Sequence, residues 1–416
     1  MFMTSSTPRW SNRATKLLLL FVIFVAIFSL GVSGVIAQSQ ILSFMGNNFN
    51  ITPSTNTSSQ MASSVAYNPN RDQWLVVWKD DRPTTGVAIY GRRVDKDANL
   101  LGSEIVVLYN PDSLDMPSVA FDSTQSRYLV VWENNTNGDI EGKVLTADGA
   151  LYSADFTIAE CVDCSNPDVV YNPVSDEYLV VWKKVNSLTD ADIRGRKVGV
   201  GGVPDPGGDF EIAAGTNKIF QYPVLAVAGN GKYLVVFSHN TTGNFDIGGQ
   251  RLNQNGSISG DVIEISDDTG DELTPDVAIN PTNNNAFVAW EHDTGTSVIK
   301  GRFVLANNDL GGQPTLSTPE GSDEGNPSLS YARTGDPYLV TWDNGVDVFG
   351  CWVNATGAIA SDIFAVTSSA NTQYAPTAAF GTDRFLVAYS EWSGQYDVWG
   401  RFGTANGRLY LPIVRK

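Results

Sequence analysis

A short phrase returns seven times along this chain of 416 residues and limits what the chain can fold into. In each copy an apolar segment, usually opened by proline, precedes a Tyr-Leu-Val-Val-Trp-like segment and then an Asp-Ile-x-Gly-x-x-Val-like segment. The middle segment ends at Trp78, Trp132, Trp182, Phe237, Trp290, Trp342 and Tyr389. These anchor residues are 54, 50, 55, 53, 52 and 47 positions apart. A period of this length indicates one supersecondary unit that is copied along the chain.

The second copy shows what one unit builds. Its short segments rich in β-forming residues are Pro117–Phe121, Tyr128–Glu133, Ile140–Leu145 and Ala150–Ala159. Turns rich in Asn, Asp, Gly and Ser separate them, and no helical period interrupts them. Each unit is therefore predicted to form four short β-strands.

The strand that ends at Trp132 is apolar on both faces. Tyr128, Val130 and Trp132 alternate with Leu129 and Val131, whereas a strand that is covered on one side alternates apolar with polar residues. Burial on both faces requires a neighbouring sheet on either side, which radial packing of sheets provides. The sequence thus predicts an all-β fold, a seven-bladed β-propeller of four-stranded antiparallel blades.

The two ends of the repeat region predict how the ring closes. The fourth strand is recognisable at Asp155–Ala159, Asp209–Ala213, Asp261–Ile265 and Asp362–Val366. The last copy reaches the end of the chain at about the point where this strand should begin, and a matching segment stands at Asn48–Thr52. We therefore expect the N-terminal strand to complete the last blade, which would also remove a sheet edge. The alternative outer strand, Leu409–Val414, contains Pro412, which cannot donate a ladder hydrogen bond.

The N-terminus carries an export signal. Arg9, Arg13 and Lys16 precede an apolar run at 17–30 and small residues before position 38, a pattern typical of a signal peptide. An uncleaved signal anchor is the alternative, since 17–37 is long enough to span a bilayer. The predicted organisation is a signal peptide or anchor at 1–37, a linker at 38–47 and the propeller at 48–416. The protein is expected to be secreted or displayed at the cell surface, and to meet a membrane only through an uncleaved N-terminal segment.

Charge excludes one class of partner. The net charge is −18, and removal of 1–37, with its three basic and no acidic residues, would take it to −21. Such a surface repels phosphate backbones, so nucleic-acid binding is not expected. We expect a monomer.

Three cysteines are present. Cys161 and Cys164 form a Cys-Val-Asp-Cys pair in a loop, for which a small disulfide is one interpretation and unpaired structural thiols another. A redox pair would open a helix, and a zinc site would need more ligands. Cys351 stands alone in a strand and is expected to be buried.

The repeated motifs Tyr-Leu-Val-Val-Trp and Asp-Ile-x-Gly-x-Arg-Val resemble those of a family of secreted bacterial repeat proteins. These proteins are in turn similar to seven-bladed β-propellers. The resemblance covers nearly all of residues 48–407. It implies the architecture but little about activity, because propellers support both binding and catalysis.

The connections of such a meander divide between two faces. The second-to-third strand connections and the blade-to-blade connections emerge on one face, where the sequence is variable and acidic. Binding sites usually lie on variable loops that a rigid scaffold carries. We therefore expect a site on this face or in the central channel.

Aromatic residues on this face are the candidate ligand-binding residues. They are expected to lie in loops, where core packing does not require them: Phe220, Tyr222 and Phe245 near blade four, and Tyr374, Trp392 and Tyr396 near blade seven. Rings with one apolar and one polar side suit stacking on sugars or on a protein partner. Packing across blade edges is the alternative interpretation.

Two further patterns are predicted to be structural. An Asp precedes the third strand in five copies and suits an Asx-turn or a contact with the recurrent Arg after Gly, as in Arg196 and Arg302. The two histidines, His239 and His292, occupy equivalent positions in adjacent copies, where convergence on one ion is not expected. We expect no metal ion and no cofactor.

No motif for nucleophilic or metal-dependent hydrolysis occurs. The sequence favours a non-catalytic binding or scaffold propeller that recognises an extracellular glycan or an envelope protein. The alternative is a polysaccharide-active enzyme, a glycoside hydrolase or lyase, with carboxylates at the channel mouth.

Overall fold

The computed structural model describes residues 43–52, 59–81, 86–109, 113–240, 243–318, 323–333, 337–367 and 369–404. Residues 40–416 form one compact unit. The predicted signal segment, the first half of the predicted linker (38–42) and the alternative outer strand at 409–414 lie outside the described residues. Within the described ranges, no helix is long and apolar enough to cross a bilayer.

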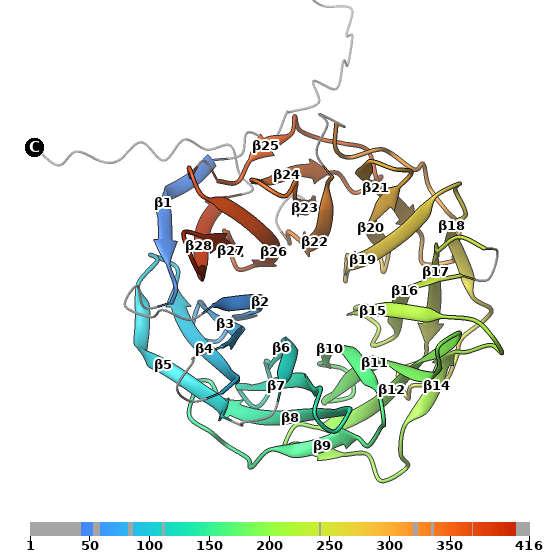
Figure 1. Cartoon of the computed structure of the whole chain (residues 1–416), viewed down its shortest axis with the longest axis horizontal. Helices are drawn as coiled ribbons and strands as arrows, with labels where there is room; N and C mark the ends of the chain where they lie inside the picture. The colour runs from blue at the N-terminus through green and yellow to red at the C-terminus, as the bar shows by residue number, and fades with distance from the viewer. Residues whose placement is uncertain are drawn as a thin grey trace, which may run out of the picture. The chain divides into compact units, whose positions relative to one another are not determined.

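Seven antiparallel sheets stand around a central axis, as blades around a hub (Figure 1). Blades one and two consist of β2 (Gln60–Asn68), β3 (Gln73–Asp80), β4 (Ala88–Asp95), β5 (Leu100–Tyr109), β6 (Leu114–Asp122), β7 (Arg127–Asn134), β8 (Asp139–Thr146) and β9 (Phe156–Ala159). Blade three consists of β10 (Cys164–Asn172), β11 (Glu177–Ser187), β12 (Asp190–Gly199), β13 (Val203–Pro204) and β14 (Phe210–Ala213).

The other four blades follow the same plan. Blades four and five consist of β15 (Phe220–Val227), β16 (Tyr233–His239), β17 (Asp246–Leu252), β18 (Ile263–Ser266), β19 (Asp271–Ile279), β20 (Ala286–Asp293) and β21 (Ser297–Val304). Blades six and seven consist of β22 (Gly325–Tyr331), β23 (Tyr338–Asp343), β24 (Val348–Val353), β25 (Phe364–Ala365), β26 (Thr372–Phe380), β27 (Phe385–Trp392), β28 (Tyr396–Thr404) and β1 (Ser43–Asn50). The predicted all-β, seven-bladed fold is confirmed.

Blade five differs in its outer edge. Its named strands number three, and the fourth position is taken by a segment that bridges Lys300 to Thr315. The Gly301 N–H donates to the Pro314 carbonyl at 3.1 Å, and the Leu316 N–H donates to the Ile299 carbonyl at 2.7 Å. Backbone pairing therefore continues across this blade although the outer segment is irregular.

The seven anchor residues form the interior of the ring. All of them are at most 1% exposed. Each apolar cluster joins two adjacent blades: Trp182 of blade three, for example, packs in one cluster with Val131 and Ile140 of blade two. The two apolar faces of the anchor strand are thus covered by different neighbours, which is why the sequence lacks the alternation of a one-sided sheet.

The N-terminal strand closes the ring. β1 pairs antiparallel with β28, so blade seven is ordered β1-β28-β27-β26. The Phe49 ring stacks on Phe402 with centroids 5.7 Å apart, and Ile51 is fully buried. The predicted closure is confirmed, and the strand starts at Ser43, earlier than the expected Asn48.

In blades three and five, an arginine of the third strand ties the blade to the one before it. Arg196 on β12 donates to the Ile158 carbonyl at 2.7 Å, and Arg302 on β21 donates to the Ile265 carbonyl at 2.6 Å. Both acceptors belong to the outer strand of the preceding blade. These guanidinium groups therefore satisfy backbone acceptors between blades.

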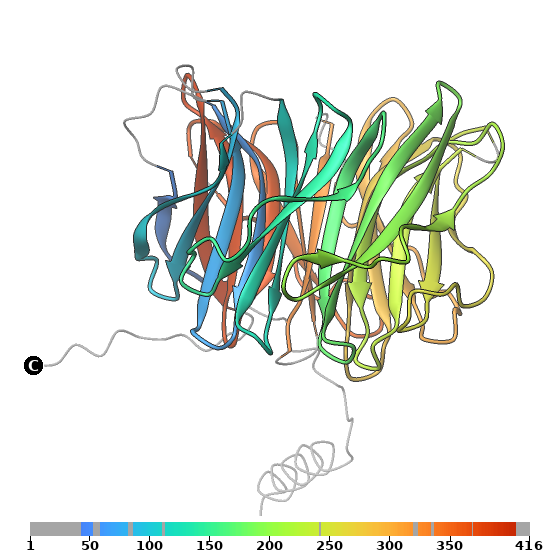
Figure 2. The ribbon, with the colours of Figure 1, turned by 90° about the horizontal axis from the view of Figure 1, so that it is seen from below.

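The connections between the second and third strands and the connections between blades lie on the same face of the ring (Figure 2). The Glu272 N–H, at the entry to blade five, donates to the Phe245 carbonyl in the β16–β17 connection at 2.7 Å. The Asn135 N–H, after β7, donates to the Ser113 carbonyl before β6 at the same distance. Loops that differ between blades therefore surround one mouth of the channel.

Candidate functional site

The innermost strands surround a pocket of about 580 Å³ on the axis of the ring. Six residues that each precede a proline line it: Met116, Asn166, Tyr222, Thr274, Asn326 and Ala375. The prolines that follow them also line it, as do Met61, Lys79, Asp115, Ser390 and Tyr396. We call this space the central pocket.

A repeated β-bulge shapes the pocket wall. The pairing register of every inner strand shifts at this point, for example between Asp115 and Ser118 in blade two. The six pre-proline residues have φ between 46° and 52°, in the left-handed region. Proline has no N–H to donate and is tolerated at a bulge, where the ladder is already interrupted. Non-glycine residues in this region carry strain, and such strain is typical of functional sites.

In blades three and five, the residue after the proline links neighbouring inner strands. Asp168 on β10 accepts hydrogen bonds from the Ser118 hydroxyl of blade two at 2.8 Å and from the Leu225 N–H of blade four at 3.0 Å. Asp276 on β19 accepts one from the Leu329 N–H of blade six at 2.6 Å. These two carboxyl groups therefore hold the inner ring together.

Their environment disfavours the charged form. Burial raises the pKa of the Asp168 carboxyl above its usual range. Burial also raises the pKa of Asp276 to about 7, and the negative charge of Asp168 adds to the increase. Both residues line the central pocket.

A second set of acids supports the bulges. The Asn166 N–H of blade three donates to Glu133 of blade two at 2.9 Å, and the Ala375 N–H of blade seven donates to Asp343 of blade six at 2.9 Å. Glu133 and Asp343 each follow an anchor residue directly. Burial raises the pKa of both carboxyl groups. The bulge N–H groups of Asn166 and Ala375 are thereby satisfied.

The Lys79 ammonium is the basic group of the pocket lining. Its Nζ lies 3.0 Å from an Asp115 carboxylate oxygen of the next blade. The pair provides one donor and one acceptor beside the otherwise apolar prolines, which suits recognition of a polar ligand.

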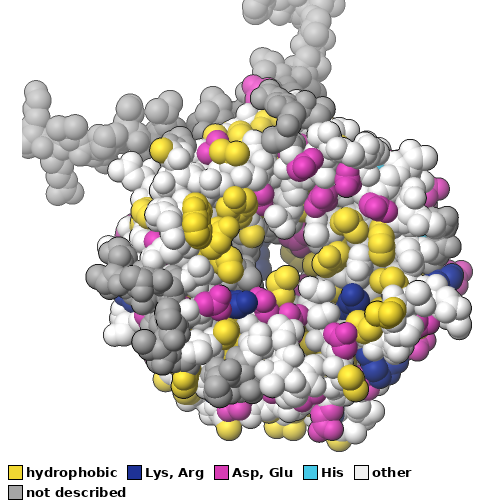
Figure 3. All heavy atoms as spheres, viewed as in Figure 1, with side chains coloured by type: hydrophobic (Ala, Val, Ile, Leu, Met, Phe, Trp, Pro, Cys, Tyr) yellow, Lys and Arg dark blue, Asp and Glu magenta, His cyan; other side chains and the backbone are white. Residues whose placement is uncertain are grey.

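Three aromatic rings form a wall from the central pocket to the surface. Tyr374 and Tyr396 both line the pocket, with ring centroids 5.9 Å apart. Trp392 lies 4.7 Å from Tyr396 and is 43% exposed. Figure 3 shows hydrophobic side chains gathered over the blade of β26–β28, next to the central opening. We call Tyr374, Tyr396 and Trp392 the aromatic wall.

The other predicted aromatic residues lie elsewhere. Tyr222 lines the pocket from blade four, whereas the aromatic wall belongs to blade seven. Phe245 lies half-buried in the β16–β17 connection. The expected loop position is wrong for five of the six aromatic residues, which lie in strands: Phe220 and Tyr222 in β15, Tyr374 in β26, Trp392 in β27 and Tyr396 in β28. Phe220 begins its strand and is 5% exposed. Its ring packs on Phe237 with centroids 5.6 Å apart, so it belongs to the core between blades.

The cysteines take one of the two predicted arrangements. Cys161 and Cys164 form a disulfide at the entry to β10, and Cys351 is a buried free thiol. The two histidines do not share a site: His239 and His292 lie in separate groups with carboxylates of their own neighbourhoods. Both groups lie outside the lining of the central pocket.

The three residues of the aromatic wall were among the candidates from the sequence, and their role in binding stays a prediction. The β-bulges at the prolines were not predicted. The proline that opens each inner strand was read only as a strand start. The residue before it carried the missing signal, because a pre-proline residue is restricted and a proline inside a paired strand requires a bulge.

Comparison with solved structures bears out the fold. A protein of unknown function from Dyadobacter fermentans aligns with a TM-score of 0.54 at 9% identity, over 87% of this chain and 99% of that one. The GH93 α-L-arabinofuranosidase of Fusarium graminearum, solved with arabinobiose, aligns with a TM-score of 0.51 at 12% identity, over 86% and 97%. The β-propeller domain of the Trilobed protease from Pyrococcus furiosus aligns with a TM-score of 0.50 at 8% identity, over 86% and 99%. No protein-family model and no curated protein matches the chain. At these identities the likeness shows the propeller fold alone.

Proposed function

We propose that the protein is a non-catalytic binding propeller that recognises an extracellular carbohydrate at the central pocket. The observation that carries this proposal is the aromatic wall, which runs from the pocket lining at Tyr374 and Tyr396 to the exposed Trp392. Aromatic rings beside a pocket that also holds polar groups offer an apolar face to the C–H face of a sugar ring.

The dimensions and polarity of the pocket support a small ligand. A volume of about 580 Å³ falls within the range of small-molecule sites. The Lys79–Asp115 ion pair and the Thr274 hydroxyl supply hydrogen-bonding groups from other blades of the lining. Apolar prolines and methionine side chains complete the wall, a mixture that suits the alternating apolar and hydroxyl surfaces of an oligosaccharide.

An exported location belongs to the same proposal. The basic and apolar pattern of residues 1–37 supports export, and the Cys161–Cys164 disulfide suits an oxidising compartment. In this proposal the protein is secreted or held at the cell surface, where glycans are abundant.

Binding to a glycan array tests the proposal, with arabinobiose included as the sugar held by the Fusarium propeller. The purified protein should bind at least one oligosaccharide, and Trp392→Ala should weaken that binding at least tenfold. Trp392 is exposed, so its removal should leave folding intact. The control is Tyr152→Ala, in the β8–β9 connection, where the ring is 48% exposed. An array without signal, or equal binding by both variants, would contradict carbohydrate recognition. Capture of a defined envelope protein that depends on Trp392 would instead favour a protein ligand.

A glycoside hydrolase is the second candidate, and one observation favours it. Asp276 has a pKa of about 7 and shares the pocket with a second carboxyl group, Asp168. A protonated carboxyl beside a second acid is the arrangement that glycosidases use. The backbone amides that both groups bind already explain their presence, which is why we favour binding. Release of reducing ends from a polysaccharide by the protein, abolished in Asp276→Asn while Trp392-dependent binding persists, would establish the enzyme instead.

A further inference from the structure

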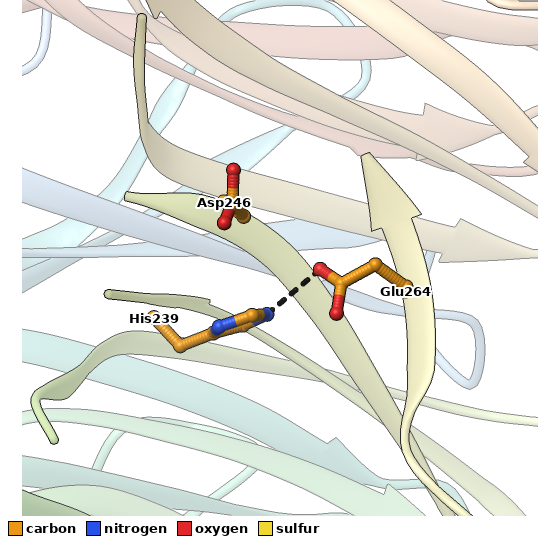
Figure 4. Close-up of side chains that lie close together, drawn as sticks. All are labelled: His239, Asp246 and Glu264. Atoms are coloured by element: carbon orange, nitrogen blue, oxygen red, sulfur yellow. Dashed lines mark hydrogen bonds and ion pairs between the residues drawn. The ribbon is translucent and has the colours of Figure 1, made fainter. Parts of the chain in front are cut away.

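A histidine and two carboxylates converge on one blade, away from the central pocket. His239 ends β16, Asp246 begins β17 directly opposite it in register, and Glu264 lies on β18. Figure 4 shows the three side chains pointing toward one another from these three strands. Their ligand atoms all lie within 4.8 Å of one another, and His239 Nε2 is 3.0 Å from Glu264 Oε1.

A glycine makes the room for this group. Gly248 pairs with both Phe237 and Glu264, so its missing side chain would lie between them. A Cβ at this position would approach the His239 ring to 2.8 Å. In the other six blades the residue opposite the anchor has a large side chain: Tyr90, Glu141, Arg194, Lys300, Phe349 and Trp399. Blade four therefore combines the histidine with a space that no side chain of its third strand fills.

Blade five provides an internal comparison. His292 occupies the position equivalent to His239, and it groups with Asp268 and Glu272. There, however, the Lys300 ammonium lies 2.6 Å from an Asp268 carboxylate oxygen. Lys300 occupies the register position that Gly248 has in blade four. A lysine thus brings positive charge to the acids of blade five, and blade four has a glycine in its place.

We propose that His239, Asp246 and Glu264 bind a divalent first-row metal ion of the Zn²⁺ class. One imidazole nitrogen and two carboxylate oxygens are zinc ligands, and an imidazole favours zinc over calcium or magnesium. Two carboxylates with a neutral imidazole balance the charge of a divalent ion. Ligands of tetrahedral zinc stand about 3.3 Å apart, from metal–ligand distances of about 2.0–2.2 Å. The His239–Glu264 pair already has this spacing, and a small movement of Asp246 would complete it.

Burial fits an ion that three side chains hold and that keeps one open position. His239 and Asp246 are each 2% exposed, whereas the Glu264 side chain is 46% exposed. The ion can enter from the Glu264 side, and water can fill the fourth position. Bound there, it would tie β16, β17 and β18 together. The site is independent of carbohydrate binding at the central pocket.

Calorimetric titration of the untagged, chelator-treated protein tests the proposal. Zn²⁺ should bind with one ion per chain, and Ca²⁺ at least tenfold more weakly. Glu264→Gln should weaken zinc binding at least tenfold, and its exposed position makes misfolding an unlikely cause of the loss. Anomalous scattering at the zinc edge should place the ion beside His239.

Two matched controls separate this site from nearby acids. His292→Gln removes the equivalent histidine of blade five, and Asp261→Asn removes an exposed acid of blade four. Both should bind zinc as the unaltered protein does. The proposal is overturned by absent zinc binding, by unchanged binding in Glu264→Gln, by loss of binding in His292→Gln, or by calcium that binds as tightly as zinc.

Discussion

The Asp276 carboxylate of blade five accepts a hydrogen bond from the backbone N–H of Leu329 in blade six, at 2.6 Å. The same oxygen-to-amide link joins Asp168 of blade three to Leu225 of blade four at 3.0 Å. Serines take this role elsewhere: the Ser64 hydroxyl accepts from the Val119 N–H at 3.3 Å. The inner ring is thus held by short polar side chains that reach across each blade boundary.

Removing one such link should destabilise the whole ring. Asp276→Ala leaves the N–H groups of Val277 and Leu329 without their acceptor, at a cost of about 1–3 kcal/mol in the free energy of unfolding. Urea unfolding at pH 5 measures this. Asp261→Ala, which removes an exposed acid, should change the free energy by less than about 0.5 kcal/mol. Equal stabilities of the two variants would show that the link contributes nothing.

The raised pKa of Asp276 predicts how stability depends on pH. Its folded pKa of about 7 lies above the ordinary value of 3.8, so the folded state binds the proton more tightly. This contribution is fully present below about pH 4 and is lost as pH rises through 7. The melting temperature should therefore fall between pH 5 and 8, and fall less in Asp276→Asn, which cannot ionise. A variant with the unaltered slope would rule out Asp276 as the source.

The closing strand should contribute substantially to stability. Ile51 follows β1, is fully buried and packs in a cluster with Trp78 and Leu386. Ile51→Ala should cost about 2–5 kcal/mol in the free energy of unfolding, as expected for a buried large-to-small change. Ile258→Ala, at a site 50% exposed, is the matched control and should be nearly neutral. If the two substitutions have the same effect, the N-terminal strand does not dock in solution.

Thiol counting distinguishes the two arrangements weighed for the cysteines. The native protein should give no reaction with a thiol reagent, since Cys351 is fully buried and burial raises the pKa of its thiol to about 12. Unfolding without a reductant should expose one thiol, and reduction should expose three. Three thiols before reduction would mean that Cys161 and Cys164 are not joined.

The fold was predictable because the packing of the blades leaves a clear pattern of apolar residues in the sequence. A strand such as Tyr128–Trp132, apolar on both faces, has few solutions other than sheets stacked on both sides. The closing strand was predictable because a missing outer strand at one end was matched by an extra one at the other.

The details of the candidate site depended on geometry that propensity does not encode. Met116 and Ala375 take positive φ because proline and strand pairing demand a bulge, although neither residue favours that region. Phe220 was expected in a loop because the start of β15, which brings its ring onto Phe237, is not marked in the sequence. Glu264 lies beside His239 because of the pairing register of β17 and β18. The chain has many acidic residues, so the sequence alone does not single out Glu264.

The β1–β28 seam has a consequence for the order of folding. The Thr52 hydroxyl accepts a hydrogen bond from the Val398 N–H, 346 positions away along the chain. Blades one to six can each assemble from contiguous residues, but blade seven is complete only when the first and last strands meet. Such distant contacts are slow to form, because the loop between them must be closed before they stabilise anything. We therefore expect the N-terminal strand to dock last, after the other six blades have formed, and to close the ring.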